Sequence, residues 1–103
     1  MFKKKKYSDV HTECWNLDET IISWLIEHLK VFKEDASKCI KMDFHKFEYK
    51  GEIVAFDVLL DKLIDLLDEV KVLMDELRDP DRAEEAKNEA FEILSLIFWC
   101  LWW

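Results

Sequence analysis

Residues 53–78, with the sequence IVAFDVLLDKLIDLLDEVKVLMDELR, decide the fold of this chain. Large apolar side chains recur there at alternating spacings of four and three, a pattern that repeats over three heptads and is typical of an amphipathic helix. The members of this stripe are Phe56, Leu60, Leu63, Leu67, Val70, Met74 and Leu77. Leu59, Leu66 and Leu73 run beside it at intervals of seven, so the apolar face is wide enough for a bundle helix. We therefore predict a helix over 53–78 at the centre of the fold.

A second apolar stripe precedes this helix, over about 18–36. Its members recur at spacings of three and four: Ile22, Leu25, Leu29, Phe32 and Ala36. Either Asn16 or Asp18 can cap the start of this helix, because a short polar side chain there accepts a hydrogen bond from a free backbone N–H. This stripe predicts the first helix of the chain.

A third stripe follows the central helix, over about 80–102. Asp79 suits the capping position and Pro80 suits the first helical position. The apolar members are Ala83, Ala86, Ala90, Leu94, Ile97 and Leu101. The sequence therefore predicts an all-α fold, in which three main helices at about 18–36, 53–78 and 80–102 form a small bundle.

Residues 37–52 fit neither a helix nor a long strand. Apolar residues alternate with polar ones through Ile40, Met42 and Phe44, and the alternation then changes phase at His45. A short strand needs a paired neighbour, which the rest of this chain hardly supplies. We predict an ordered loop or a short strand at 40–50.

The composition indicates one folded domain. The chain has 103 residues, of which 50% are apolar and 14% are aromatic, so it can bury a core and disorder is not expected. One Gly and one Pro leave few tight turns, which argues against a many-stranded sandwich or barrel. We predict a single helical domain over 1–103, in which residues 1–14 form a polar entry segment.

Acidic charge gathers in the second half of the chain. Residues 1–50 carry ten Lys and Arg against nine Asp and Glu, whereas residues 51–103 carry five against fourteen, which leaves +1 and −9. This balance argues against binding duplex DNA and suits a basic protein partner. One face of the central helix carries Asp57, Asp61, Asp65, Asp68 and Asp75. We interpret this aspartate stripe as a partner-binding surface; the alternative is an ordinary solvated face, softened by Lys62 and Lys71.

A basic and aromatic group lies in the connection at 40–50. Its members are Lys41, Phe44, His45, Lys46, Tyr49 and Lys50. Aromatic rings can stack on a base while lysines meet phosphate, so this group is a candidate site for a small nucleotide ligand. The alternative is that the rings anchor the loop in the core while the lysines point to water.

The end of the third predicted helix is apolar on almost every side. A helix of this kind must be buried all round, and three helices alone would struggle to cover it. We therefore predict a homo-oligomer with an interface formed by Phe91, Phe98, Trp99, Trp102 and Trp103. The alternative is that these rings pack within the core of the monomer.

Neither the cysteines nor the apolar runs indicate a secreted or membrane protein. Cys14, Cys39 and Cys100 are odd in number and far apart, which is typical of reduced thiols in a cytosolic protein. The longest apolar run, 91–103, is shorter than the roughly 20 residues that span a membrane, and Glu92 interrupts it. We expect a cytoplasmic protein that contacts no membrane.

The sequence contains no catalytic or metal-binding motif. A glycine-rich phosphate loop, a nucleophile elbow and an HExxH zinc helix are all missing from it. His11 and Cys14 have the local spacing of zinc ligands, but no second pair completes a site. We expect His28 to be a partly buried structural residue. These observations predict a protein that is not an enzyme and that holds neither a cofactor nor a metal.

Three patches of the sequence resemble a family of small phage and prophage proteins. The first joins Tyr7-Ser8-Asp9 and Trp15-Asn16-Leu17-Asp18 to Leu25, Leu29 and Phe32-Lys33, the second is Leu59-Leu60-Asp61-Lys62-Leu63-Ile64, and the third is Phe98 with Leu101-Trp102. Family members often carry a Pro in the first helix and a Gly-Tyr-Pro loop after it. This chain instead has Ile26-Glu27-His28 and Ala36-Ser37-Lys38. The resemblance implies a viral accessory protein in the cytoplasm of an infected bacterial host, and it assigns no functional residue.

The resulting functional hypothesis is a non-enzymatic, phage-encoded binding protein that interferes with a host process. The first version is an inhibitor of an antiviral defence that acts on a host protein. One alternative is a sponge that sequesters a nucleotide second messenger, and another is a structural or assembly protein of the phage particle.

Overall fold

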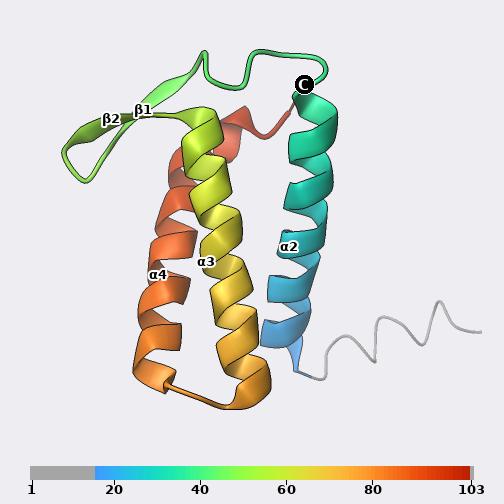
Figure 1. The fold of residues 1–103 in the computed structure, drawn as a ribbon, viewed down its shortest axis with the longest axis vertical. Helices are drawn as coiled ribbons and strands as arrows, with labels where there is room; N and C mark the ends of the chain where they lie inside the picture. Colours follow the sequence, from blue (N-terminus) through green and yellow to red (C-terminus); the bar gives the residue numbers. More distant parts are fainter. Residues whose placement is uncertain (1–15, 103) are drawn as a thin grey trace, which may run out of the picture.

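The computed structural model describes residues 16–102, which form a small helical bundle with a short hairpin (Figure 1). In chain order the elements are helix α2 (Leu17–Ala36), strands β1 (Lys46–Tyr49) and β2 (Glu52–Ala55), helix α3 (Phe56–Glu76), helix α4 (Pro80–Ile97) and the 3-10 helix η1 (Phe98–Cys100). This architecture confirms the prediction of a three-helix bundle. The predictions that concern residues 1–15 and Trp103, including the pair His11 and Cys14, lie outside the described residues.

Helix α3 is the centre of the core, as its apolar stripe predicts. Its largest fully buried side chains are Phe56, Leu59, Leu60, Leu63 and Leu67. Ile22, Ile26 and Leu29 of α2 pack into the same core, together with Ala86, Ala90, Ile93 and Ile97 of α4. Both outer helices are therefore held in place mainly by their contacts with α3.

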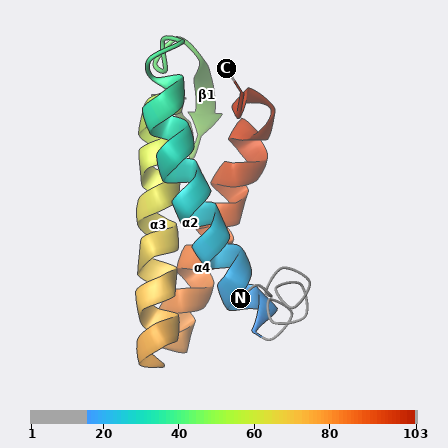
Figure 2. The same ribbon diagram turned by 90° about the vertical axis from the view of Figure 1, so that its right-hand side faces the viewer.

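The two outer helices make almost no direct contact with each other. Helix α3 packs extensively against α4 and less extensively against α2. Figure 1 shows α2 and α4 on opposite sides of α3, and the turned view in Figure 2 shows α2 running obliquely across the bundle. Because α2 and α4 are not packed together, part of their inner surfaces stays open above α3.

The connection contains the short strand predicted within 40–50, but this strand is one half of a hairpin whose second strand was not predicted. Strands β1 and β2 pair antiparallel, with Phe47 opposite Val54 and Tyr49 opposite Glu52. The turn uses Lys50 and Gly51, both at positive φ (53° and 79°), as the type I′ turn of a two-residue hairpin requires. The partner strand lies in a stretch that was assigned to the central helix, so α3 begins at Phe56 and the predicted start at residue 53 is wrong. Ile53 is 71% exposed, as befits an edge of a small hairpin rather than a buried helical stripe.

The ends of α4 bear out one local prediction and correct another. Asp79 caps the helix, since its Oδ1 accepts a hydrogen bond from the Arg82 N–H at 3.1 Å, and Pro80 occupies the first turn. The helix ends at Ile97, however, and not at residue 102. At that point α4 has run antiparallel along α3 to the first turn of α3, so a longer helix would have no neighbour. The chain turns back instead, and Leu101 packs partly buried against the core.

Candidate binding groove

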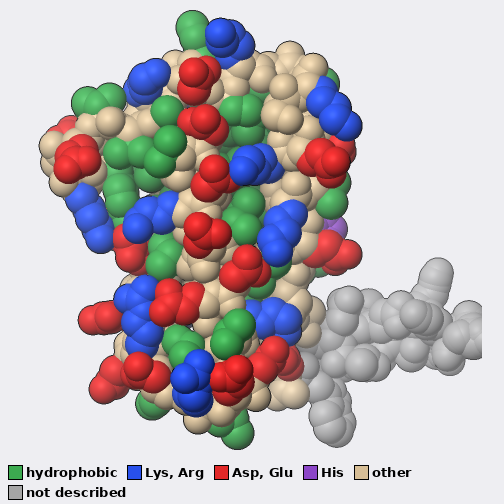
Figure 3. Space-filling model, in the orientation of Figure 1, with side chains coloured by type: hydrophobic (Ala, Val, Ile, Leu, Met, Phe, Trp, Pro, Cys, Tyr) green, Lys and Arg blue, Asp and Glu red, His purple; other side chains and the backbone are tan. Residues whose placement is uncertain are grey.

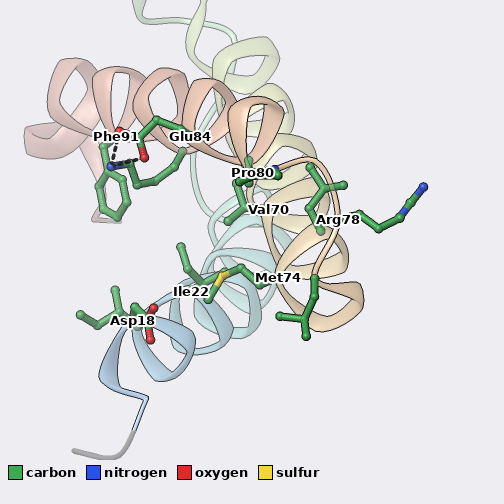
Figure 4. Close-up of a pocket in the computed structure, with 13 residues that line it drawn as sticks. Asp18, Ile22, Val70, Met74, Arg78, Pro80, Glu84 and Phe91 are labelled. Carbon is green, nitrogen blue, oxygen red and sulfur yellow. Dashed lines mark hydrogen bonds and ion pairs between the residues drawn. The ribbon is translucent and has the colours of Figure 1, made fainter.

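A cavity lies between α2 and α4, with α3 as its floor. It measures about 510 Å³ and opens to solvent at the end of the bundle where α3 turns into α4. Figure 4 shows Ile22, Val70 and Met74 pointing into this space, with Phe91 of α4 on one side and Asp18 of α2 on the other. We name this cavity the groove. It exists because α2 and α4 diverge instead of packing together.

The groove is lined mainly by apolar side chains. They are Ile21 and Ile22 of α2, Val70, Leu73 and Met74 of α3, Leu77 of the following turn, and Pro80, Ala83 and Phe91 of α4. The deep members are buried, whereas Ile21 and Phe91 at the rim are 43% and 37% exposed. The groove therefore offers apolar surface that no other described residue covers, and exposure of such surface to water is unfavourable.

Leu77 is the most unusual residue of the groove. It closes the last turn of α3 with φ 52° and ψ 45°, in the left-handed region where Gly or Asn normally stands. Its N–H donates to the carbonyl of Met74 at 3.2 Å, and its side chain is 92% exposed. A large apolar residue at this position strains the backbone, and its side chain is not packed within the described fold.

The groove lining carries two acidic residues, Asp18 and Glu84, and two basic ones, whereas the hollow at its mouth is lined by acidic residues alone among the charged types. The two cations in the lining already have acidic partners, since Lys87 lies 3.2 Å from Glu84 and the Nε of Arg78 lies 2.6 Å from Glu76. Figure 4 also shows the Arg78 side chain pointing away from the cavity. A second hollow adjoins the groove and is lined by Asn16, Asp18, Glu19, Met74, Asp75 and Leu77. Its carboxylates give the mouth a net negative charge.

No member of the aspartate stripe on α3 lines the groove itself, although Asp75 borders the adjoining hollow. Asp61 pairs with Lys33 of α2, Asp68 lies 3.5 Å from Lys30, and Asp75 lies 3.4 Å from Lys71. The Oδ1 of Asp57 accepts a hydrogen bond from its neighbour Val58, and Asp65 is exposed. Figure 3 accordingly shows acidic and basic side chains side by side over this face. Much of the stripe's charge is thus compensated within the chain.

The structure divides the predicted nucleotide-binding residues into two groups. Lys41, Phe44 and His45 surround a small hollow of about 260 Å³, together with Ile40, Cys100 and Trp102. The Phe44 ring is 74% exposed and meets the His45 ring edge-on at 5.8 Å between centroids. Lys46 is turned back, because its Nζ donates to the carbonyl of Asp43 at 2.9 Å.

The second group, Tyr49 and Lys50, attaches the hairpin to α4. The Tyr49 hydroxyl donates to the Glu89 carboxylate, and the Lys50 Nζ lies 2.9 Å from the same oxygen. Hydrogen bonds from Tyr49 and then Lys50 lower the pKa of Glu89 to about 2. Burial, followed by the hydrogen bond to Glu89, raises the pKa of Tyr49 to about 12. Tyr49 and Lys50 therefore attach the hairpin to α4.

A second polar contact joins α3 to α4 near the turn between them. The Arg82 guanidinium donates to both carboxylate oxygens of Glu69, at 2.6 and 2.8 Å, and this pairing lowers the pKa of Glu69. The sequence analysis did not select Glu69, Arg82 or Glu89 as candidate residues. Their pairing depends on the contacts between separate elements, for which the sequence carries no local signal.

The predicted oligomer-interface residues are spread over three places. Phe91 lines the groove, Phe98 and Trp99 are exposed and stack edge-on at 5.1 Å, and Trp102 borders the small hollow. Trp99 is 83% exposed. The alternative, that the rings pack within the core of the monomer, therefore does not hold for Phe98, Trp99 and Trp102, which are exposed.

His28 is exposed, which corrects the expectation of a partly buried residue. Its ring stacks on Trp24 with centroids 3.9 Å apart, and its Nδ1 lies 2.8 Å from the Trp24 carbonyl oxygen. Cys39 and Cys100 carry free thiols. Within residues 16–102 no three His, Cys, Asp or Glu side chains gather closely enough to hold a metal ion. In that same part of the chain, no helix is long and apolar enough to cross a membrane.

Comparison with protein-family models, with curated proteins and with solved structures finds no match to this chain. The resemblance to small phage proteins therefore stays a prediction. The geometry of the groove, and not a relative, has to support a functional proposal.

Proposed function

We propose that this protein is a non-enzymatic binding protein that takes the apolar face of a partner protein's helix into its groove. The observation that carries the proposal is the open, apolar cavity between α2 and α4, whose floor is already formed by α3. A helix laid there would contact both outer helices and complete the bundle, in the manner of other helix-in-groove complexes. Binding of this kind needs no catalytic group.

A helix suits this groove better than a small polar ligand does. Small-molecule sites combine an apolar enclosure with several polar groups that converge on the ligand. Here Ile22, Val70 and Met74 point inward, whereas the Arg78 side chain points away (Figure 4). The wall on α4 carries Ala83, Lys87 and Phe91 at intervals of four, a span of roughly 12 Å, or about two helical turns.

The resemblance to phage proteins indicates which partner to test first. A viral accessory protein in an infected bacterium would act by occupying a host protein, and a component of an antiviral defence is the first target we propose. In this version the groove makes the main contact. The aspartate stripe contributes less than the sequence pattern indicates, because Lys30, Lys33 and Lys71 compensate three of its charges.

The proposal is tested by photocrosslinking from within the groove. The full chain carries a photoreactive phenylalanine analogue in place of Phe91, and the crosslinked peptide is identified by mass spectrometry. We expect one partner segment, which is lost when Ile21→Glu is added and retained with the control Ile53→Glu on the exposed hairpin. Crosslinks that survive Ile21→Glu, or that match those from an analogue placed at position 53, would contradict the proposal.

A second candidate function rests on the small hollow beside Trp102. Lys41, Phe44 and His45 come together there, and an exposed aromatic ring next to a lysine can hold a base and its phosphate. Native mass spectrometry of the purified protein with added cyclic and linear dinucleotides tests this function. Dinucleotide binding that Lys41→Glu abolishes, and that the control Lys38→Glu leaves intact, would support a nucleotide sponge. If no dinucleotide stays bound, these nucleotides are ruled out as its ligands.

A further inference from the structure

We infer that the helix accepted by the groove is basic on the flanks of its apolar face, and that Leu77 is one of the residues that contact it. This inference rests on the proposed function and adds the chemistry of the partner. Two independent observations carry it. One is the charge at the groove mouth, and the other is the conformation and exposure of Leu77.

The charge around the mouth selects a cationic partner. Asp18, Glu19 and Asp75 border the hollow that continues the groove, and Lys71 is the basic residue paired with the last two, at 4.0 and 3.4 Å. Asp18 receives only the backbone N–H of Glu19, at 2.8 Å, among the described contacts. Lys and Arg side chains flanking an apolar helix face would meet these carboxylates, whereas Glu and Asp would be repelled.

The position of Leu77 indicates a contact that the isolated chain does not make. A residue at positive φ without a functional role is usually Gly or Asn, because other side chains are strained there. Leu77 has φ 52° and is 92% exposed, yet it lines both the groove and the adjoining hollow. Breaks in a local rule of this kind concentrate at functional sites. A helix seated on Val70 and Met74 would pass over Leu77 and cover it.

The test uses two fluorescent model helices and the full chain. Both peptides carry Leu and Phe at positions i, i+3, i+4 and i+7; one has Lys on the flanking positions and the other has Glu. Fluorescence anisotropy should give an affinity for the Lys peptide at least about tenfold higher than for the Glu peptide, and added salt should narrow this difference. Ile21→Glu should weaken binding of both peptides, whereas the control Ile53→Glu should not.

Leu77→Gly separates a binding role from a structural one. Removal of the strained side chain should raise the Tm by a few degrees, because Gly adopts this conformation without strain. The same change should lower the affinity for the Lys peptide by about tenfold, which is the loss expected when one buried apolar side chain is removed from the contact. The matched control is Val72→Gly at an exposed helical position outside the groove, which should lower the Tm and leave the affinity unchanged.

Each outcome bears on a different part of the inference. Equal affinities for the Lys and Glu peptides would overturn the basic partner while leaving the groove as a binding site. An unchanged affinity in Leu77→Gly would overturn the role of Leu77. Binding of neither peptide, together with crosslinks from position 91 that ignore Ile21→Glu, would overturn the proposed function itself. A dimer that Phe91→Glu dissociates would make a second copy the occupant and would overturn the inference.

Discussion

The two sides of α4 face different neighbours and are built differently. On the hairpin side, Glu89 accepts hydrogen bonds from Tyr49 and Lys50, and Arg82 pairs with Glu69, so these partly exposed charged groups have partners. On the groove side, Phe91 faces an open cavity that nothing in the described chain fills. The hairpin side stabilises the fold, whereas the groove side keeps apolar surface available for another molecule. The proposed function thus assigns stability and binding to opposite sides of one helix.

The largest expected effect comes from comparing two phenylalanines. Phe56 is fully buried beneath the hairpin, where its ring contacts those of Phe32 and Phe47, whereas Phe91 lies on the groove rim. Phe56→Ala should lower the free energy of unfolding by about 3–5 kcal/mol, as expected for a core phenylalanine. Phe91→Ala should lower it by less than about 1 kcal/mol while removing groove binding. Urea denaturation measures the unfolding free energy of both variants. Equal decreases in the two variants would contradict the distinction between the two sides of α4.

The next largest effect comes from replacing Glu89, whose contribution to stability depends on pH. Its pKa in the folded protein, about 2, lies below the ordinary value of 4.5, so its carboxylate stabilises the fold above about pH 4.5. That contribution is lost as the pH falls from 4.5 towards 2. Glu89→Gln should therefore cost about 1–2 kcal/mol at pH 7 and lose less stability than the native chain across this window. Parallel curves for the two proteins would contradict the role of Glu89.

Tyr49 gives the complementary test at high pH. Its pKa in the folded protein is about 12, above the ordinary value of 10, so the neutral hydroxyl stabilises the fold below pH 10. This contribution should disappear between pH 10 and 12. Tyr49→Phe should lower stability by about 1 kcal/mol at pH 7, and should remove this part of the alkaline decline, measured by circular dichroism. A variant as stable as the native chain at pH 7 would show that the hydroxyl does not hold the hairpin.

The smallest expected effect concerns the aspartate stripe. Asp61 pairs with Lys33 across the exposed seam between α2 and α3, where such contacts contribute about 0–1 kcal/mol. Lys33→Ser should therefore change the unfolding free energy by less than about 1 kcal/mol and leave groove binding unchanged. A larger loss in urea denaturation would show that this seam, and not only the hairpin side, holds the bundle together.

The sequence predicts the individual helices better than it predicts how the helices pack against one another. The alternating stripe identifies α3, and Asp79 with Pro80 marks the start of α4, because these signals act within one or two turns. Leu77 continues the same stripe, yet it is the most exposed large apolar residue described, since the helix has already ended there. Spacing shows which residues share a face and cannot show whether another element covers it.

The hairpin and the groove were missed for different physical reasons. Ile53 and Val54 were assigned to the helix because they precede its stripe directly, so β1 had no visible partner. The groove depends on the angle at which α2 crosses α3, which follows from the packing of the whole core. Phe91 was consequently predicted as part of an oligomer interface, although together with Ile21 it forms the rim of the groove.

A methyl NMR titration of the full chain with the Lys-flanked helix would show whether the groove between α2 and α4 binds this helix. If the peptide binds in the groove, the methyl signals of Ile21, Ile22, Met74 and Leu77 should shift together with increasing peptide. The signals of Leu59 and Leu60, which are fully buried in the core, should stay in place. Shifts confined to the far end of the bundle around Ile40 and Leu101, or no shifts at saturating peptide, would contradict the claim that the groove between α2 and α4 is the binding site.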